Sequence, residues 1–165
     1  WFEQSLTYCN GILPQAMFNV YAVNGDKKCL QIAHETLNFL CDVLFKDGYL
    51  NIVGNNGWYY KNGTMPLFDQ QPVDAASIIY SCIDAYETIG EMRYLELAVT
   101  AYKWYHGNNI HGLSLYDPNT GGCFDGLTPR GVNLNQGAEA ILSLLFSDIL
   151  IKDYIKEKVD IGKSS

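Results

Sequence analysis

The feature that most constrains the fold of this chain is an internal repeat with a period of 65 residues. Residues 16–40 align without gaps on residues 81–105. Residues of the same kind fall together at seven positions: Tyr21 on Tyr86, Gly25 on Gly90, Asp26 on Glu91, Lys28 on Arg93, Leu30 on Leu95, Ala33 on Ala98 and Phe39 on Trp104. A repeat of this length indicates a supersecondary unit that stacks on its own copies.

Each copy is predicted to be a helical hairpin. Gly25 and Gly90 stand where a glycine ends a helix in the left-handed conformation, and an acidic residue follows, where the dipole of the next helix favours it. Apolar residues then recur at steps of three and four, as an amphipathic second helix requires. Because each connection is short, the two helices must be antiparallel neighbours. A third unit is expected from Asn135.

Successive helical hairpins joined by long loops predict an all-α protein that forms part of an α/α toroid. A short β-hairpin is expected to be inserted around residues 49–61. Leu50 and Ile52 alternate before a Gly-Asn-Asn-Gly turn, and Trp58 and Tyr60 alternate after it.

The chain is expected to be a single partial toroid over residues 1–156, followed by a polar tail over residues 157–165. It starts at Trp1 rather than Met and has too few helices for a complete ring of six hairpins, so we expect a fragment of a longer protein. A partial ring leaves the faces of its first and last hairpins uncovered. Self-association, or docking of a preceding domain, through an apolar surface is therefore expected.

Composition limits the partners and the compartment. With 48% hydrophobic and 18% charged residues the chain is typical of a globular domain. Its net charge of −7 excludes the basic surface that nucleic acids and anionic membranes require. No apolar run is long enough to span a membrane, and no signal peptide is visible. The five cysteines are scattered without a CxxC pair, which predicts free thiols, a reducing and hence cytoplasmic location, and no metal site.

In a toroid the inner helices begin at the same end, so the loops that precede them gather around one cleft. Three such loops are expected, at residues 7–16, 68–77 and 133–140. Pro72 takes the first-turn position of the second inner helix, and Asn135 takes the N-cap position of the third.

These loops hold more carboxylates and amides than helix capping needs. Asp69, Asp125 and Glu139 are predicted catalytic residues, because glycoside hydrolysis uses two carboxyl groups about 5–9.5 Å apart. Amide, basic and aromatic side chains nearby are predicted to bind sugar hydroxyls or stack on a sugar ring: Trp58, Tyr59, Gln70, Gln71, Arg130, Asn133, Asn135 and Gln136. No cofactor is expected, because the sequence has no phosphate loop, nucleophile elbow or HExxH motif.

Structural roles compete with these assignments. Asp125 and Arg130 would brace their loop if they paired with each other. Asn135 would serve only as a helix cap if its side chain met the first turn of its helix. Trp58 and Tyr60 would serve as inter-helix packing if they were buried. The sequence leaves these alternatives open.

Four motifs then suggest a family. DQQPVDAA, LYDPNTGGCFDGL and NQGAEA, with NNGWYY upstream, resemble the C-terminal helical region of bacterial glycosyltransferase-type proteins, over residues 7–150. The resemblance implies an α/α toroid that follows a nucleotide-sugar-dependent transferase domain, with a glycan as substrate. It carries over no catalytic residue, and Cys9-Asn10-Gly11 stands where an acidic or amide pair is expected.

The predicted function is therefore that of a carbohydrate-associated helical domain of a glycosyltransferase-type protein, which binds or processes a glycan at the starts of the inner helices. Whether the domain is itself an enzyme stays open at this point. The alternative is a non-catalytic module that uses its helical repeats to bind another protein.

Overall fold

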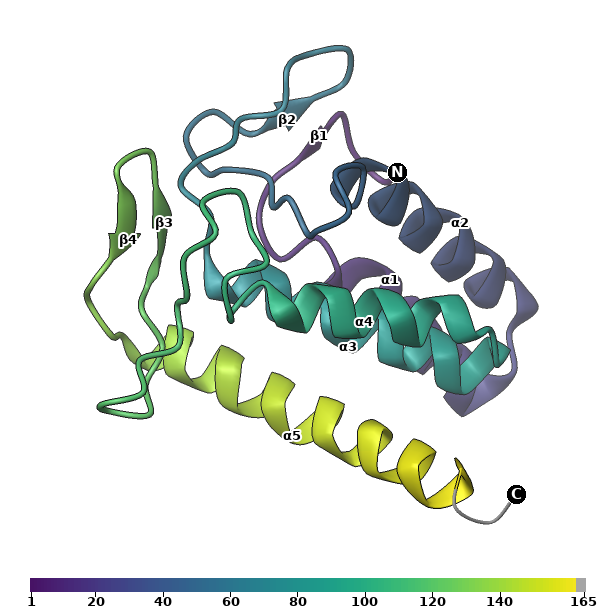
Figure 1. Ribbon diagram of the computed structural model, residues 1–165. Helices are drawn as coiled ribbons and strands as arrows, with labels where there is room; N and C mark the ends of the chain where they lie inside the picture. Colours follow the sequence, from purple (N-terminus) through teal and green to yellow (C-terminus); the bar gives the residue numbers. More distant parts are fainter. Residues whose placement is uncertain (163–165) are drawn as a thin grey trace.

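The computed structural model describes residues 1–162, and their side chains as far as residue 154. Within this range the chain is mainly helical (Figure 1), which confirms the all-α prediction. The helices are α1 (Ile12–Asn24), α2 (Lys27–Leu44), α3 (Pro72–Ile89), α4 (Met92–Lys103) and α5 (Ala138–Gly162). The strands form two antiparallel pairs, β1 (Ser5–Leu6) with β2 (Tyr59–Tyr60) and β3 (Gly126–Thr128) with β4 (Gly131–Asn133).

The sequence repeat corresponds to two helical hairpins, α1–α2 and α3–α4. Gly25 and Gly90 both have left-handed backbones, with φ of 71° and 81°. Each donates its backbone N–H to the carbonyl of the equivalent tyrosine, Tyr21 or Tyr86, at 2.8 Å. Asp26 then caps α2 through its side chain. The predicted helix–glycine–helix junctions are confirmed.

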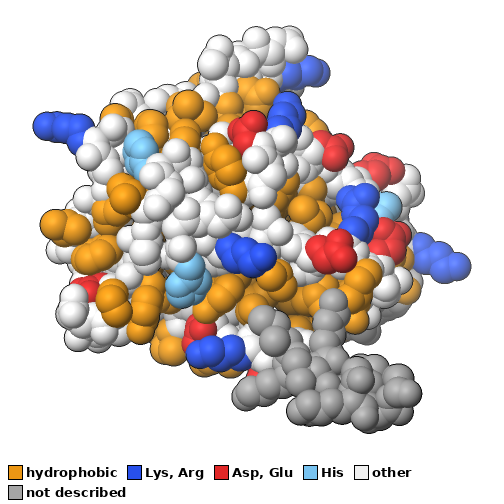
Figure 2. All heavy atoms as spheres, viewed as in Figure 1, with side chains coloured by type: hydrophobic (Ala, Val, Ile, Leu, Met, Phe, Trp, Pro, Cys, Tyr) orange, Lys and Arg blue, Asp and Glu red, His pale blue; other side chains and the backbone are white. Residues whose placement is uncertain are grey.

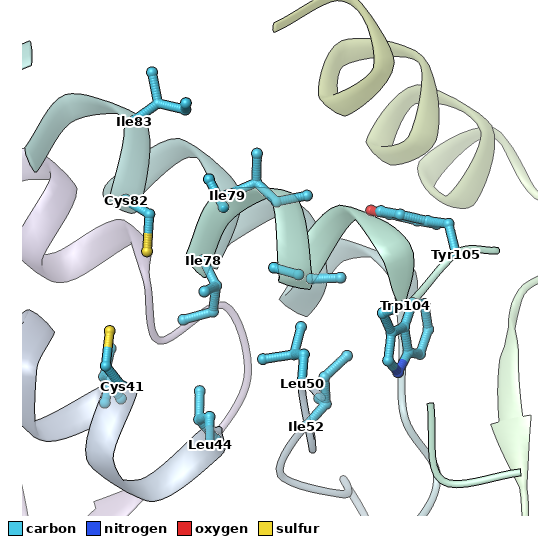
Figure 3. Close-up of a cluster of buried hydrophobic side chains, with 14 of the residues drawn as sticks. Cys41, Leu44, Leu50, Ile52, Ile78, Ile79, Cys82, Ile83, Trp104 and Tyr105 are labelled. Carbon is cyan, nitrogen blue, oxygen red and sulfur yellow. The ribbon is translucent and has the colours of Figure 1, made fainter. Parts of the chain in front are cut away.

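Helix α3 is the centre of the molecule, because it packs against all four other helices, α1, α2, α4 and α5. It buries eleven residues, whereas α1 buries only Pro14 and Phe18. Figure 3 shows part of this core, with Ile78, Ile79 and Ile83 of α3 among its labelled side chains. The apolar side chains of α3 are therefore covered by other helices on several sides, as expected of an inner helix.

Helix α5 continues the repeat as a third unit. Helix α3 begins at Pro72, so a repeat of 65 residues places the next start at residue 137. Helix α5 begins one position later, at Ala138. The helix runs to Gly162 and so passes the boundary predicted at residue 156. Residues 163–165 of the predicted tail lie outside the described residues, and the domain boundaries stay predictions.

Only one of the two strands expected around residues 49–61 forms there. Tyr59 and Tyr60 make β2, but this strand pairs with β1 instead of with residues 50–52. Leu50 and Ile52 are buried in the core, at 0% and 2% exposure. The backbone N–H groups of this part of the chain donate elsewhere, that of Asn51 to the Leu44 carbonyl at 2.8 Å. The predicted pairing within residues 49–61 is therefore corrected by a longer-range one.

Several apolar side chains of α5 are exposed: Ile141, Leu142, Leu145, Phe146 and Ile149. Figure 2 shows hydrophobic side chains interrupting the polar surface on one face of the molecule. Association through such a surface stays a prediction. Among the described residues, no helix combines the length and hydropathy needed to cross a membrane.

Candidate functional site

A polar cleft with a volume of about 310 Å³ opens where α3 and α5 begin. Its walls are the loop before α3, the β3–β4 hairpin and the first turn of α5. The polar residues that line it are Asn55, Asp69, Gln70, Gln71, Asp125, Thr128, Asn133 and Glu139. This chemistry suits a ligand with many hydrogen-bonding groups.

All three carboxylates that were predicted to be catalytic line this cleft. Asp69 comes from the loop before α3, Asp125 directly precedes β3, and Glu139 lies in the first turn of α5. Gln71 and Asn133, two of the predicted substrate contacts, line it as well. The fold thus brings together side chains that lie up to 70 positions apart in the sequence. Their roles in binding or catalysis stay predictions.

Asp125 holds the start of α5. Its carboxylate accepts the backbone N–H of Gly137 at 2.6 Å and also accepts a hydrogen bond from the side-chain amide of Asn135. The cap predicted for Asn135 is wrong, because α5 begins three residues later, at Ala138, and the Asn135 side chain donates to Asp125 instead of accepting an N–H of the first turn. In the described part of the chain Asp125 makes no ion pair with Arg130, which is exposed at the turn between β3 and β4.

Asp69 and Glu139 differ from Asp125. Within the described residues, no hydrogen bond or ion pair engages either of their side-chain carboxylates. Asp69 is half-buried and Glu139 is exposed. These two carboxylates therefore remain available to a ligand in the cleft.

Gln70 supports the cleft from inside the protein. Its side chain is fully buried, where Nε2 donates to Oδ1 of Asn51 at 2.9 Å and Oε1 accepts from Nε1 of Trp104 at 3.0 Å. Its backbone exchanges two hydrogen bonds with Leu127 of β3, both at 2.9 Å. Gln70 is among the residues that line the cleft, and its side-chain amide is engaged by Asn51 and Trp104, so its predicted contact with substrate stays a prediction.

Five of the predicted contacts do not line the cleft: Trp58, Tyr59, Arg130, Asn135 and Gln136. Trp58 stacks on Tyr8 with their ring centroids 6.2 Å apart. Tyr59 belongs to β2 and lines a different cavity. Gln136 donates from Nε2 to the Asp117 carboxylate at 2.9 Å and so braces the turn that follows Asp117. These positions depend on contacts that the sequence pattern did not reveal.

Asp74 is buried beside the cleft but was not among the predicted site residues. Its Oδ1 accepts the backbone N–H of Cys9 at 2.6 Å. Burial raises the pKa of Asp74 to about 7, the Cys9 N–H opposes this rise, and the nearby Glu139 carboxylate adds to it. Burial, with Asp74 and Glu139 close by, also raises the pKa of the Cys9 thiol to about 11.

The repeat could have revealed this cluster. Cys9, Asp74 and Glu139 follow one another at intervals of 65 residues, at or near the starts of α1, α3 and α5. The Cys9 N–H donates to Asp74, and Cys9, Val73 and Glu139 line one pocket, so the starts of the three helices converge. This agrees with the expectation that the inner helices begin at one end.

Inner helices that begin together, each followed by an antiparallel outer partner in the first two units, define part of an α/α toroid. Three solved structures that match this fold are named as GH76 or family 76 enzymes. A GH76 alpha-mannanase from Bacteroides thetaiotaomicron matches with a TM-score of 0.65 and 17% identity, over 93% of this chain and 40% of its own. An alpha-1,6-mannanase from a Salegentibacter species matches with a TM-score of 0.66 and 17% identity, over 92% of this chain and 43% of its own.

A third match is a family 76 glycoside hydrolase from a bovine strain of Bacteroides thetaiotaomicron. Its TM-score is 0.57 at 18% identity, over 93% of this chain and 33% of its own. The sequence matches no protein-family model and no curated protein. The likeness therefore establishes the toroid fold, and this chain spans less than half the length of each of the three structures.

These structures support one part of the resemblance noted in the sequence. They support the α/α toroid and give no support to a glycosyltransferase. The Salegentibacter structure is an inactive variant, in which two consecutive aspartates are replaced by asparagine, in complex with alpha-1,6-mannotriose. The present chain contains no two adjacent acidic residues.

Proposed function

We propose that the cleft binds a glycan through Asp69 and Glu139. The observation that carries this proposal is the pair of unengaged carboxylates within a polar cleft at the starts of two inner helices. Carboxylates accept hydrogen bonds from sugar hydroxyls, while the amides of Gln71 and Asn133 can both donate and accept. Asp125 contributes indirectly, because it fixes the first turn of α5 that carries Glu139.

The sugar proposed for the first test is an α-1,6-linked mannooligosaccharide. The similar structures are named as alpha-mannanases, and one of them holds alpha-1,6-mannotriose. A cytoplasmic location and a partner glycosyltransferase domain belong to this proposal as predictions from the sequence alone.

Binding is the core of the proposal, and hydrolysis is a separate question. Hydrolysis requires one carboxyl group to protonate the leaving oxygen and the other to attack the sugar or activate water. Asp69 and Glu139 are the pair proposed for these roles if hydrolysis occurs.

Calorimetric titration with alpha-1,6-mannotriose tests the proposal. Asp69→Asn and Glu139→Gln should each weaken binding about tenfold or more, because hydrogen bonds to charged groups contribute roughly 1.5–3 kcal/mol. Glu96→Gln, on the exposed surface of α4, is the matched control and should leave affinity unchanged. Equal affinities in all three variants would contradict the proposal, and chromatography for released mannose would decide on hydrolysis.

A second candidate function is the helical interaction module. It is favoured by the exposed apolar side chains of α5, since monomeric proteins seldom expose large contiguous apolar patches. Light scattering distinguishes it: Leu145→Glu with Ile149→Glu should abolish self-association. A wild-type protein that is monomeric throughout would rule out association between copies of this chain.

A further inference from the structure

A second cavity, with a volume of about 440 Å³, lies beside the β1–β2 sheet. It shares no lining residue with the cleft, and its volume falls in the range of about 300–1,000 Å³ typical of ligand pockets. One part of its wall is aromatic, formed by Trp1, Phe39, Tyr59 and Tyr60. These side chains come from three separate segments that the fold brings together.

The aromatic wall is formed before any ligand arrives. Trp1 Nε1 donates to the Ser5 carbonyl at 3.0 Å, and its ring packs against Phe39 with centroids 6.0 Å apart. Tyr59 is held by its place in β2. Tyr60 and Phe39 are 56% and 39% exposed, so these rings retain accessible surface.

Apart from Leu6, the rest of the lining is polar, and its charged side chains balance. Glu3 and Lys61 supply one charge of each sign, and Gln4 and Asn62 supply amides. In the described part of the chain these four side chains make no hydrogen bonds or ion pairs with other residues. Their donors and acceptors therefore remain available, while the balanced charges favour a neutral ligand.

We propose that this cavity is a second saccharide-binding site. A sugar ring is neutral, carries an apolar C–H face that packs on an aromatic ring, and carries hydroxyls that match amides and charged groups. Tyr59 was predicted from the sequence to bind sugar, and the structure puts it here instead of in the cleft. The proposal takes from the proposed function only the choice of the first sugar to be tested.

The experiment is fluorine NMR on protein labelled with 5-fluorotryptophan and titrated with alpha-1,6-mannotriose. The chain has three tryptophans. Trp1 reports on the second cavity, and Trp104 reports on the cleft through its hydrogen bond to Gln70. The Trp1 resonance should shift and saturate. Tyr60→Ala should raise the dissociation constant measured at Trp1 about tenfold and leave the Trp104 response unchanged.

Asp69→Asn is the matched control, because it should alter only the Trp104 response. Phe39→Ala is a second cavity variant, and an unchanged free-state Trp104 resonance verifies that each variant is folded. The second site would be overturned if the Trp1 resonance did not shift at millimolar trisaccharide. It would also be overturned if Trp1 gave the same dissociation constant in the wild type and both cavity variants. If the cleft did not bind the sugar, the result would be distinct, because the Trp104 resonance would not shift during the titration.

Discussion

The hairpins α1–α2 and α3–α4 carry the same sequence repeat but differ in burial. Leu13 of α1 is 41% exposed, whereas Ile78, its equivalent 65 residues later in α3, is 2% exposed. Helix α3 packs against four other helices, and α1 packs against two. The repeat therefore specifies the hairpin, while the position in the stack decides which faces are covered, as expected of repeat proteins.

The same difference appears at the helix starts. The equivalent residues are a thiol in the first unit (Cys9), a buried carboxyl in the second (Asp74) and an exposed carboxylate in the third (Glu139). One backbone position has thus diverged in chemistry and exposure. Only the third of these residues faces the cleft.

The largest effect expected is at the equivalent pair Leu13 and Ile78. Ile78→Ala should destabilise the protein by about 2–5 kcal/mol, because it leaves a cavity in the core. Leu13→Ala should cost less than about 1 kcal/mol, because its side chain is already partly in water. Urea unfolding measures both changes, and equal losses would show that α1 and α3 are covered to the same extent.

Asp74 should make stability depend on pH. Its carboxyl titrates near 3.9 when unfolded and at about 7 when folded, so the folded state binds more protons between these values. The stabilisation is complete below about pH 4 and is lost as the pH rises to 7, with an upper bound of about 4 kcal/mol. Asp74→Asn should flatten this profile in urea unfolding between pH 4 and 8. An unchanged slope would refute the assignment.

The loop before α3 has a buried glutamine, Gln70, next to a more exposed one, Gln71, and substitutions of the two should differ in their effect on stability. Gln70→Ala should cost about 2–3 kcal/mol, because the Trp104 N–H and the Asn51 amide lose their buried partner. Gln71→Ala should change stability by less than about 0.5 kcal/mol. Thermal unfolding followed by circular dichroism measures both. A Gln70 variant as stable as the Gln71 variant would argue against the buried network.

The smallest loss of stability is expected at the two helix junctions, and it should be the same in both hairpins. Gly25→Ala and Gly90→Ala place a side chain on a left-handed backbone, and an added Cβ meets no atom within 4 Å at either site. Each should therefore cost about 1–2 kcal/mol from backbone strain alone. Urea unfolding should give matching values, and clearly unequal costs would mean that the two junctions are not equivalent.

The sequence was informative where local chemistry or the repeat decided the outcome. Gly25 and Gly90 located the helix ends, and the order of inner helices was enough to gather Asp69, Asp125 and Glu139. The sequence was not informative where contacts with residues far away in the chain determine the structure. The Gln70 side chain points into the core because it bonds to Trp104, which is 34 positions away in the sequence. Strand β2 pairs with β1, and their partners Ser5 and Tyr60 are 55 positions apart.

The most direct test of the central claim is a crystal structure of this chain with alpha-1,6-mannotriose. The sugar should occupy the cleft at the starts of α3 and α5, with hydroxyls within hydrogen-bonding distance of the Asp69 and Glu139 carboxylates. An empty cleft in the presence of excess trisaccharide, or sugar bound only at other surfaces, would contradict the account.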